Sequence, residues 1–483
     1  MKITELGLNL TTIVFYTNII LAFVVIFLSR KNPSTTWAWV LVLMFIPVLG
    51  FVLYLFLGQD TRRINIFAQK ERQDEKKRKT LFQNLLLEER SDLHHPAIKT
   101  DKDLMRLHLH NANSIFTQDN QIQVLKNGEE KFSALIKALK SAQHHIHMEY
   151  YIIRNDEIGK EIRDILVAKA REGVEVRLLY DGMGCIALPK SYAKPIIEAG
   201  GEVAVFFPPF IPHINIRVNY RNHRKITIID GKTAFFGGLN LGDEYLGRSP
   251  KYGYWRDTHF QVEGSSVDYL QLCFLTDWEF AAKTTVAYNK KYFPTKKQTG
   301  HKGVQIITSG PDSKWDSIHQ GYFKMISNAK KSIYIQTAYF VPDDSLITAL
   351  KTAALSGVEV RIIIPGKRDH PFVHWASISY LSELLDSGAQ AYIYDYDNFM
   401  HVKAVIVDGS IASVGSSNFD IRSFIYNFEI NAVIYDEEVA SCLEHQFRDD
   451  LQNCIKMTRE LYEKRSFLIR FKESVSRLIS PLL

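Results

Sequence analysis

The chain has 483 residues, more than a single hydrophobic core usually organises, so at least two globular units are expected. Hydrophobic residues make up 46% and charged residues 23%, which excludes a disordered polymer, and the net charge of +6 is modest enough that its position matters more than its size. Four cysteines, with no C-x-x-C pair and no Cys/His ligand spacing, argue against a disulfide framework and a structural zinc site and favour a reducing compartment.

The N-terminal sixty residues contain two long uncharged stretches. Neither residues 6–29 nor residues 32–59 include a charged side chain, and about 20 apolar residues in a helix cross the ~30 Å hydrocarbon layer of a bilayer. We therefore predict a transmembrane helical hairpin over residues 1–60, with its joint at residues 30–34. A cleaved signal peptide, burial of both stretches in a soluble core and a re-entrant first segment are the alternatives.

A basic stretch follows, within residues 61–110, which we predict to be a juxtamembrane linker. Its cations nearest the membrane are Arg62, Arg63, Lys70, Arg72, Lys76, Lys77, Arg78 and Lys79. Because cytoplasmic flanks are enriched in Lys and Arg, this run predicts a multi-pass protein of the cell membrane with its bulk on the cytoplasmic side. The run is either a solvated helix or a segment lying on anionic lipid head groups, and both interpretations leave it exposed.

The rest of the chain repeats one pattern of strands and amphipathic helices twice. The pentapeptide GVEVR occurs at residues 173–177 and again at residues 357–361, and it marks the register of the duplication. Apolar strands joined by helices are typical of a mainly parallel sheet covered on both faces. We expect an α/β fold made of two homologous domains, residues 111–300 and residues 301–465.

Each repeat contains the same polar motif, NHRKITIIDGKTAFFGGLN in the first and MHVKAVIVDGSIASVGSSN in the second. The matched residues are His223, Lys225, Asp230 and Asn240 in the first, and His401, Lys403, Asp408 and Asn418 in the second. Positions i and i+2 of a strand share a face, so each histidine is presented together with its lysine. The aspartate falls in an Asp-Gly turn and is expected to hold a hairpin and not to face a substrate.

These residue types suit chemistry on a phosphodiester. An imidazole can attack phosphorus to form a phosphoryl-histidine, a lysine neutralises the non-bridging oxygens, and an asparagine amide donates a hydrogen bond to developing charge. With two copies, one histidine acts as the neutral nucleophile while the other transfers protons to and from the alcohols. We expect carboxylates to orient the rings and to hold their two pKa values apart, and the candidates are Asp257 and Glu429, which follow the two motifs.

The paired H-x-K-x4-D segments, each followed by G-[GS]-x-N, resemble the signature of the phospholipase D superfamily. The segments GGLNLGDEYLG (237–247) and YWRDTHFQVEG (254–264), together with the paired N-terminal apolar stretches, resemble bacterial cardiolipin synthases. The resemblance covers nearly the whole chain and is weakest over about residues 60–110. It implies two phospholipase D-like α/β domains packed pseudo-symmetrically around one active site without a metal, preceded by the pair of transmembrane helices.

The resemblance also implies a reaction, transphosphatidylation. One phosphatidylglycerol gives its phosphatidyl group to the enzyme and releases glycerol, and a second phosphatidylglycerol accepts the group, which gives cardiolipin. No cofactor or nucleotide is implied, and the partners are phosphatidylglycerol and anionic membrane lipids. By analogy His223 is the nucleophile and His401 is the general acid and base, while Ser416, which stands where the first motif has Gly238, offers a hydroxyl for phosphate contact.

Other functions compete with this one. A phospholipase D-type hydrolase, or a phosphatidyltransferase that uses another alcohol, shares the same chemistry. A nuclease of the superfamily is expected to carry a basic groove with aromatic stacking platforms and has little need of membrane spans, so no nucleic-acid partner is expected. A non-catalytic membrane scaffold would not require two complete motifs. The sequence does not fix the oligomeric state.

Three further segments need interpretation. The loop FFPPFIP, residues 206–212, either packs between the domains or lines a path for acyl chains. The C-terminal amphipathic helix, residues 466–483, is either a core or dimer helix or an interfacial helix lying on the bilayer. His144, His145 and His147 have no partnering acids at ligand spacing, so no metal site is expected there.

Overall fold

The computed structural model of the chain describes residues 12–13, 15–23, 33–46, 49–50, 54, 70, 94–208, 219–287, 289–295 and 300–480. The chain divides into two compact units, one of residues 1–68 and 210–219 and the other of residues 69–209 and 220–483. The second unit contains both copies of the repeat and every predicted site residue.

Helix α2 (Pro33–Phe45) is the main described element of the first unit. Trp39 and Leu43 of this helix are buried, and Val42 and Tyr54 pack against them. In the part of the chain that the structure describes, no helix is both long enough and apolar enough to cross a bilayer. The two stretches predicted to span the membrane extend beyond the described residues, so the transmembrane hairpin stays a prediction.

The first half of the second unit is built on a mixed sheet. The strands of this half are β1 (Thr117–Lys126), β2 (His145–Tyr150), β3 (Glu175–Asp181), β4 (Glu202–Phe206), β5 (Arg221–Asn222), β6 (Lys225–Ile229), β7 (Thr233–Gly237), β8 (Trp255–Arg256) and β9 (Thr258–Glu263), of which β5 and β8 pair with strands of the other half. Its helices are α7 (Asn127–Ser141), α8 (Glu157–Arg171), α9 (Lys194–Glu198) and α10 (Ser266–Ala282), with 3₁₀ turns η3 (Lys190–Tyr192), η4 (Asp243–Leu246) and η5 (Lys290–Tyr292). α8 begins where the Asp156 carboxylate accepts a hydrogen bond from the backbone N–H of Gly159, as a helix N-cap does.

The second half repeats this plan. Its strands are β10 (Lys302–Ser309), β11 (Ser332–Thr337), β12 (Phe340–Val341), β13 (Glu359–Pro365), β14 (Gln390–Tyr394), β15 (Phe399–Met400), β16 (Lys403–Val407), β17 (Ile411–Gly415), β18 (Phe419–Asp420), β19 (Asn427–Tyr435) and β20 (Cys454–Met457). Its helices are α11 (Ser317–Asn328), α12 (Asp344–Leu355), α13 (Pro371–Leu385), α14 (Ile421–Ile425), α15 (Glu437–Leu451), α16 (Arg459–Glu463) and α17 (Phe467–Leu478). Asp343 caps α12 as Asp156 caps α8.

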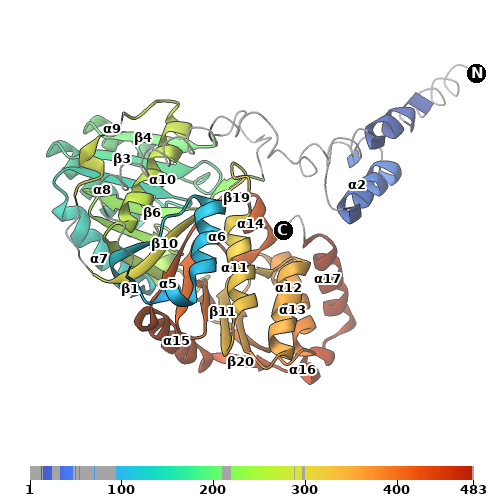
Figure 1. Ribbon diagram of the computed structural model, residues 1–483. Helices are drawn as coiled ribbons and strands as arrows, with labels where there is room; N and C mark the ends of the chain where they lie inside the picture. The colour runs from blue at the N-terminus through green and yellow to red at the C-terminus, as the bar shows by residue number, and fades with distance from the viewer. Residues whose placement is uncertain are drawn as a thin grey trace, which may run out of the picture. The chain divides into compact units, whose positions relative to one another are not determined.

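The strand order shows that the two halves are structural copies. The order is β4-β3-β2-β6-β7-β9-β1 in the first half and β14-β13-β11-β16-β17-β19-β10 in the second. Antiparallel pairing of β1 with β10, in which Thr117 faces Val304, joins the two half-sheets. The duplication that the sequence predicts is therefore a pseudo-symmetric arrangement around this joint (Figure 1).

The prediction of a mainly parallel sheet is wrong. In each half-sheet three described neighbouring strands are parallel to one another, β2, β3 and β4 in the first half and β11, β13 and β14 in the second. The strands from β2 to β1 and from β11 to β10 pair antiparallel, and so does β20 at the edge beyond β14. The reason is local. The Asp230-Gly231 and Asp408-Gly409 turns connect β6 to β7 and β16 to β17 directly, and so short a connection makes the two strands antiparallel.

Helices cover both faces of each half-sheet. Along β2, Ile146 and Met148 join the hydrophobic cluster that includes α7 and α8, while His145 and His147 on the other face form hydrogen bonds with Gln271 of α10. This alternation follows from the two-residue period of a strand. His145 and His147 therefore attach α10 to the sheet.

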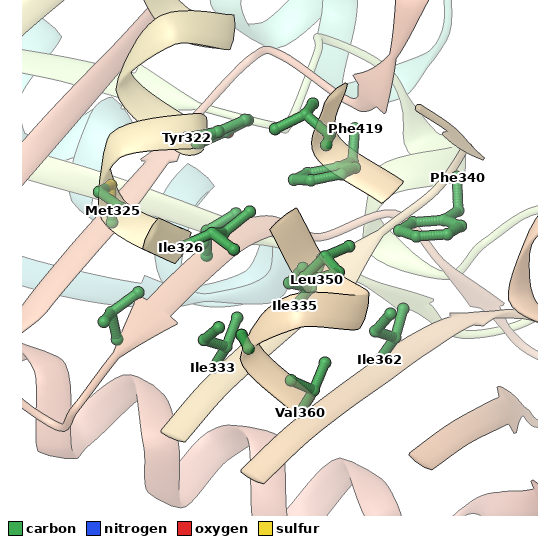
Figure 2. Close-up of a cluster of buried hydrophobic side chains, with 14 of the residues drawn as sticks. Tyr322, Met325, Ile326, Ile333, Ile335, Phe340, Leu350, Val360, Ile362 and Phe419 are labelled. Atoms are coloured by element: carbon green, nitrogen blue, oxygen red, sulfur yellow. The ribbon is translucent and has the colours of Figure 1, made fainter. Parts of the chain in front are cut away.

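The second half has an equivalent core between helices α11 and α12 and strands β11 and β13. Figure 2 shows this core, in which the labelled side chains are Tyr322, Met325, Ile326, Ile333, Ile335, Phe340, Leu350, Val360, Ile362 and Phe419. On the opposite face of β11, Tyr334 stacks on Phe447 of α15 at a centroid distance of 4.9 Å. Burial on both faces explains why these strands are almost continuously apolar.

Part of the predicted linker belongs to this fold. Residues 97–112 form α5 (Ala97–Thr100) and α6 (Lys102–Ala112), and Leu104 of α6 is buried in the core of the second half. The Lys70 side chain is 2% exposed, and its Nζ lies 3.1 Å from Asp277 Oδ1 and 2.8 Å from Asp312 Oδ2. The expectation that the basic run is exposed is therefore wrong for Lys70, because two carboxylates compensate for the burial of its charge.

Candidate active site

The two motif histidines lie where the two halves exchange short strands. His223 stands between β5 and β6, and His401 stands between β15 and β16. β5 pairs with β19 of the second half, and the N–H of His223 donates to the carbonyl oxygen of Phe428 at 3.0 Å. β15 pairs with β8 of the first half, and the N–H of His401 donates to the carbonyl oxygen of Arg256 at 2.7 Å. Each histidine is thus held by the backbone of the opposite half.

Each imidazole also takes its carboxylate from the opposite half. Nδ1 of His223 lies 3.0 Å from Oε1 of Glu429, and Nδ1 of His401 lies 2.8 Å from Oδ2 of Asp257. Both carboxylates are buried. Because Nδ1 is engaged in each ring, Nε2 is the nitrogen that is left for chemistry. The structure therefore brings both sequence candidates to the histidines, with the partners exchanged between the halves.

Lys225 and Lys403 are buried beside their own histidines. Nζ of Lys225 donates to the carbonyl oxygen of His223 at 2.5 Å, and Nζ of Lys403 donates to that of His401 at 2.6 Å. Burial lowers the pKa of Lys225 to about 7 and the pKa of Lys403 to about 8, although nearby carboxylates act in the opposite direction. These two ammonium groups therefore titrate near neutral pH.

The two histidines have similar electrostatic environments. Burial is the largest cause that lowers the pKa of each ring to about 4, and the carboxylate partner of each ring opposes it. Both rings are neutral at pH 7 in the substrate-free protein. The expectation that the environments hold the two pKa values apart is not met in this state, because the same burial acts on both rings. Burial is the largest single influence on the pKa of Glu429 and raises it, but His223, Lys225 and Ser416 together lower this pKa below its ordinary value.

The motif aspartates lie at the hairpin turns, where they bind backbone. Asp230 and Asp408 both have a φ of 55°, in the left-handed region that turns require. The carboxylate of Asp230 accepts from the N–H groups of Gln143, His144 and His145, and that of Asp408 accepts from those of Lys330, Lys331 and Ser332. Each aspartate thus ties its hairpin to the beginning of the neighbouring strand, β2 or β11.

The two motif asparagines are buried, and their contacts differ. Oδ1 of Asn240 accepts from the N–H of Ile152 at 3.1 Å, and its Nδ2 donates to the hydroxyl of Tyr245 at 3.1 Å. This amide is therefore engaged within the protein. Oδ1 of Asn418 is buried without a hydrogen-bond partner among the described residues.

Ser416 and Gly238 occupy equivalent positions with different consequences. The hydroxyl of Ser416 donates to Oε2 of Glu429 and accepts from the N–H of Ile430 at 3.0 Å, so it supports the carboxylate. In the first half, a Cβ placed on Gly238 would lie 2.1 Å from Oδ1 of Asp257. Asp257 therefore needs a glycine beside its carboxylate, whereas the carboxylate of Glu429 accommodates a serine.

Two arginines that the sequence interpretation missed hold the carboxylate segments. Arg224, between His223 and Lys225, forms a buried ion pair with Asp277, and its Nε donates to the carbonyl oxygen of Glu429 at 3.2 Å. Arg256 donates to the carbonyl oxygen of Asp257 at 2.7 Å and forms an ion pair with Asp450 at 2.8 Å. The sequence contains two signals for these arginines. Arg224 stands in the first motif (HRK) where the second motif (HVK) has a valine, and Arg256 directly precedes Asp257 in the segment WRD.

The proline-rich loop and the C-terminal segment are only partly described by the structure. Residues 209–212 of the loop lie outside the described residues, as do the last three residues of the chain. Among the residues that the structure describes, no group of three or more His, Cys, Asp or Glu side chains is arranged to hold a metal ion.

Comparisons with known proteins identify the family. A family profile described as cardiolipin synthase, PLD-like domain, matches residues 135–250 and 322–451, one segment in each half. A second profile, described as phospholipase D-nuclease N-terminal, matches residues 18–59. The major cardiolipin synthase ClsA of Bacillus subtilis is 49% identical to this chain over 98% of the chain and 99% of the relative.

Further relatives agree. The cardiolipin synthase of Oceanobacillus iheyensis is 50% identical over the full length of both proteins, and that of Listeria innocua is 46% identical over 98% of this chain and 99% of the relative. The crystal structure of a phosphatidylserine synthase from Haemophilus influenzae covers 79% of this chain and 100% of that chain, with a TM-score of 0.60 and 16% identity, and it shows the shared fold alone. The relatives extend over essentially the whole chain and the profile matches both halves, so this chain belongs to the cardiolipin synthase family with phospholipase D-like domains, as the paired motifs predict.

Proposed function

We propose that the protein transfers a phosphatidyl group from one phosphatidylglycerol to another, giving cardiolipin and glycerol, through a phosphatidyl-histidine intermediate. The observation that carries this proposal is the exchange of carboxylates between the halves, Glu429 to His223 and Asp257 to His401. The two buried sites are close enough that the lysine of each motif influences the pKa of the other motif's histidine, so the two neutral histidines and two lysines form one cluster. Family membership supports the same reaction.

In the first step, Nε2 of His223 attacks the phosphorus of phosphatidylglycerol. The N–P bond forms while the bond from phosphorus to the glycerol oxygen breaks, and His401 donates a proton to that oxygen. Glu429 stabilises the positive charge that the His223 ring gains, as the carboxylate of a catalytic triad does. The bound phosphodiester is an anion, so it raises the pKa of His401 and allows this ring to carry the proton that it donates.

In the second step, a hydroxyl of the head group of another phosphatidylglycerol attacks the phosphatidyl-histidine. His401, now neutral, accepts the proton of that hydroxyl, and the N–P bond breaks to release His223. One phosphodiester replaces another, so the reaction needs no nucleotide.

The remaining site residues have supporting roles in this proposal. Lys225 and Lys403 neutralise the non-bridging oxygens of the phosphate, whose negative charge raises the pKa values of both lysines. Asn418 donates to developing charge, Asp230 and Asp408 hold the hairpins, and Ser416 and Asn240 position their neighbours. We assign residues 111–300 and 301–465 to the two phospholipase D-like domains.

We further propose that residues 1–60 anchor the chain in the cell membrane as a helical hairpin, with the catalytic unit on the cytoplasmic side. Support comes from the two uncharged stretches and from the cations that follow them. Reporter fusions at the C-terminus test this topology. A fluorescent protein that matures in the cytoplasm should be active there and alkaline phosphatase inactive, and the reverse pattern contradicts the orientation.

The function is tested with purified full chain in vesicles of phosphatidylglycerol that carries a label in its terminal glycerol. The expected products are cardiolipin and free labelled glycerol in equal amounts, without added nucleotide. His223→Ala should abolish both products, and His401→Ala should abolish cardiolipin and release no more glycerol than the one equivalent that accompanies a phosphatidyl group on His223. His445→Ala, which changes an exposed histidine of α15, should retain both products.

Each other product pattern identifies a competing function. Phosphatidic acid without cardiolipin indicates a hydrolase, and preferential formation of a different phosphatidyl ester when alcohols are added indicates another phosphatidyltransferase. Cleavage of DNA without lipid turnover indicates a nuclease.

A further inference from the structure

Helix α17 turns its large apolar side chains outward. Phe467, Leu468, Phe471 and Leu478 have exposed fractions of 80%, 67%, 59% and 81%. An amphipathic helix on the surface of a soluble domain ordinarily buries such side chains against the core. These four residues, called the α17 surface below, therefore form an apolar area that the described residues leave exposed.

Polar contacts fix the helix in this orientation. The buried residues of α17 are Glu473 and Ser476, and Glu473 forms an ion pair with Arg465. On the side of α13, Arg477 pairs with Glu383. Rotating α17 to bury its phenylalanines would break these ion pairs, so the outward direction of the apolar side chains is specified by the fold.

The exposed charged side chains of α17 itself are positive. Arg470 and Lys472 are exposed, whereas Glu473, the sole acidic residue of α17, is turned inward. Exposed phenylalanines and leucines flanked by cations match an anionic bilayer, into which apolar side chains insert while cations meet the head groups. A second copy of the chain is a poorer match, because a symmetric contact through this surface would bring the same cations together.

The α17 surface is linked to the histidine cluster through α13. Lys472 lies over the ring of Trp375 in α13, at 5.0 Å from the centroid, and Phe372 in the first turn of α13 is exposed. Burial lowers the pKa of Lys403, and Asp369, just before α13, is one of the carboxylates close enough to oppose this effect. A bilayer held on α17 therefore lies beside the segment that leads to the site.

We propose that the α17 surface, together with Arg470 and Lys472, is a second membrane contact of the protein, which holds the second half of the catalytic unit on an anionic lipid surface. This contact is distinct in sequence from residues 1–60. It does not depend on the reaction proposed above, because it rests on the orientation and charge of one helix.

A nitroxide label at Phe471 tests the contact in the full chain. Cys442 is exposed and Cys454 is half-buried, so both are first replaced by serine, and Phe471→Cys is compared with Ile197→Cys, an exposed position on α9 of the first half. The protein is reconstituted in vesicles of phosphatidylserine and phosphatidylcholine, or of phosphatidylcholine alone. Phosphatidylserine is anionic and is not the substrate of the proposed reaction.

The label at residue 471 is expected to be more accessible to oxygen than to an aqueous nickel chelate in the anionic vesicles, and the label at residue 197 is expected to show the opposite. Equal aqueous accessibility at the two positions overturns the proposal. Dipolar broadening between labels at residue 471, independent of lipid composition, also overturns it and assigns the surface to a second copy of the chain.

An activity measurement separates docking from chemistry. The triple variant Phe467→Ser, Leu468→Ser, Phe471→Ser should turn over phosphatidylglycerol in vesicles about tenfold more slowly, because it loses apolar contact with the bilayer, and should turn over monodisperse short-chain phosphatidylglycerol at the normal rate. Ile197→Ser should behave as wild type on both. An equal loss on both substrates overturns the docking role and assigns the three residues to the fold.

Discussion

Glu429 follows His223 by 206 residues, and its Oε1 lies 3.0 Å from Nδ1 of that histidine. Asp257 stands in the reciprocal relation to His401, at 2.8 Å. Neither half of the catalytic unit therefore supplies both its motif histidine and the carboxylate that pairs with it, although each contains a complete H-x-K motif. The pairing makes the interface between the halves a part of the proposed chemistry.

Replacement of Glu429 by glutamine removes the negative charge beside His223 while it keeps the shape of the side chain. We expect kcat to fall about 10²- to 10⁴-fold with a much smaller change in KM, because the carboxylate acts mainly when the ring becomes charged. Steady-state rates on phosphatidylglycerol vesicles measure this effect. Asp449→Asn removes a carboxylate that is 65% exposed and should leave kcat unchanged. A normal kcat for Glu429→Gln would show that the pairing serves the fold alone.

The difference between Gly238 and Ser416 predicts unequal effects of two small changes. Gly238→Ala places a methyl group 2.1 Å from Asp257 Oδ1, so this carboxylate must leave its position on His401, and activity should be lost. Ser416→Ala removes a hydroxyl that supports Glu429 and should lower kcat by about tenfold. Kinetics of the two variants, with circular dichroism to verify folding, provide the comparison. Equal activity in both variants contradicts the prediction.

The pH dependence of kcat/KM follows from the lowered pKa values. With pKa values of about 7 and about 8, Lys225 and Lys403 lose their positive charges near neutral pH, and not near the ordinary lysine pKa of 10.5. We expect kcat/KM to fall as the pH rises through 7 to 8, and to fall on the acid side only toward pH 4, where His223 gains a proton. A rate that stays constant up to pH 10 would rule out a requirement for charged lysines.

Acid should also weaken the fold through the two histidines. Their pKa values are about 4 in the folded protein and 6.5 is the ordinary value, so the unfolded chain binds more protons between these limits. The free energy of unfolding should therefore decrease as the pH falls from 6.5 to 4. Thermal unfolding of His401→Asn should show a weaker dependence on pH in this window than the wild type, and an unchanged dependence would exclude this contribution.

Lys70→Met tests the buried ion pairs with Asp277 and Asp312. The variant removes the cation that compensates for the buried charges of Asp277 and Asp312, so the free energy of unfolding should fall by about 3–5 kcal/mol. Lys99→Met, an exposed change on α5, should have little effect. Thermal unfolding of the full chains in the same detergent measures the difference, and equal unfolding temperatures for the two variants would mean that Lys70 contributes nothing to stability.

The sequence predicts the duplicated α/β architecture and the motif residues because both are encoded in short, repeated spacings. Asp257 and Glu429 are also within reach of sequence reasoning, since each follows its motif at a comparable place. Their exchange between the halves is not, because it depends on the two-residue strands β5 and β15, which pair with partners in the other half of the unit. Strands of this length have no hydrophobic period to recognise.

Two of the incorrect predictions, the exposure of Lys70 and the separate pKa values of the two histidines, share one physical cause, which is burial by parts of the chain that are distant in sequence. Lys70 is buried by Asp312, 242 residues later, so a local count of charges classifies it as exposed. The two histidine pKa values are lowered together because the halves bury both rings, whereas the motifs alone indicate only that one ring must differ from the other.

Identification of the histidine that carries the phosphatidyl group distinguishes the nucleophile from the general acid and base. Full-length His401→Ala is mixed with phosphatidylglycerol labelled in its phosphate, quenched in alkali, in which phosphohistidine is stable, and digested for mass spectrometry. If His223 is the nucleophile, the phosphatidyl group is expected on His223 in this variant, and transiently on the same residue in the wild type. A phosphatidyl group on His401 in the wild type or in His223→Ala would contradict this assignment.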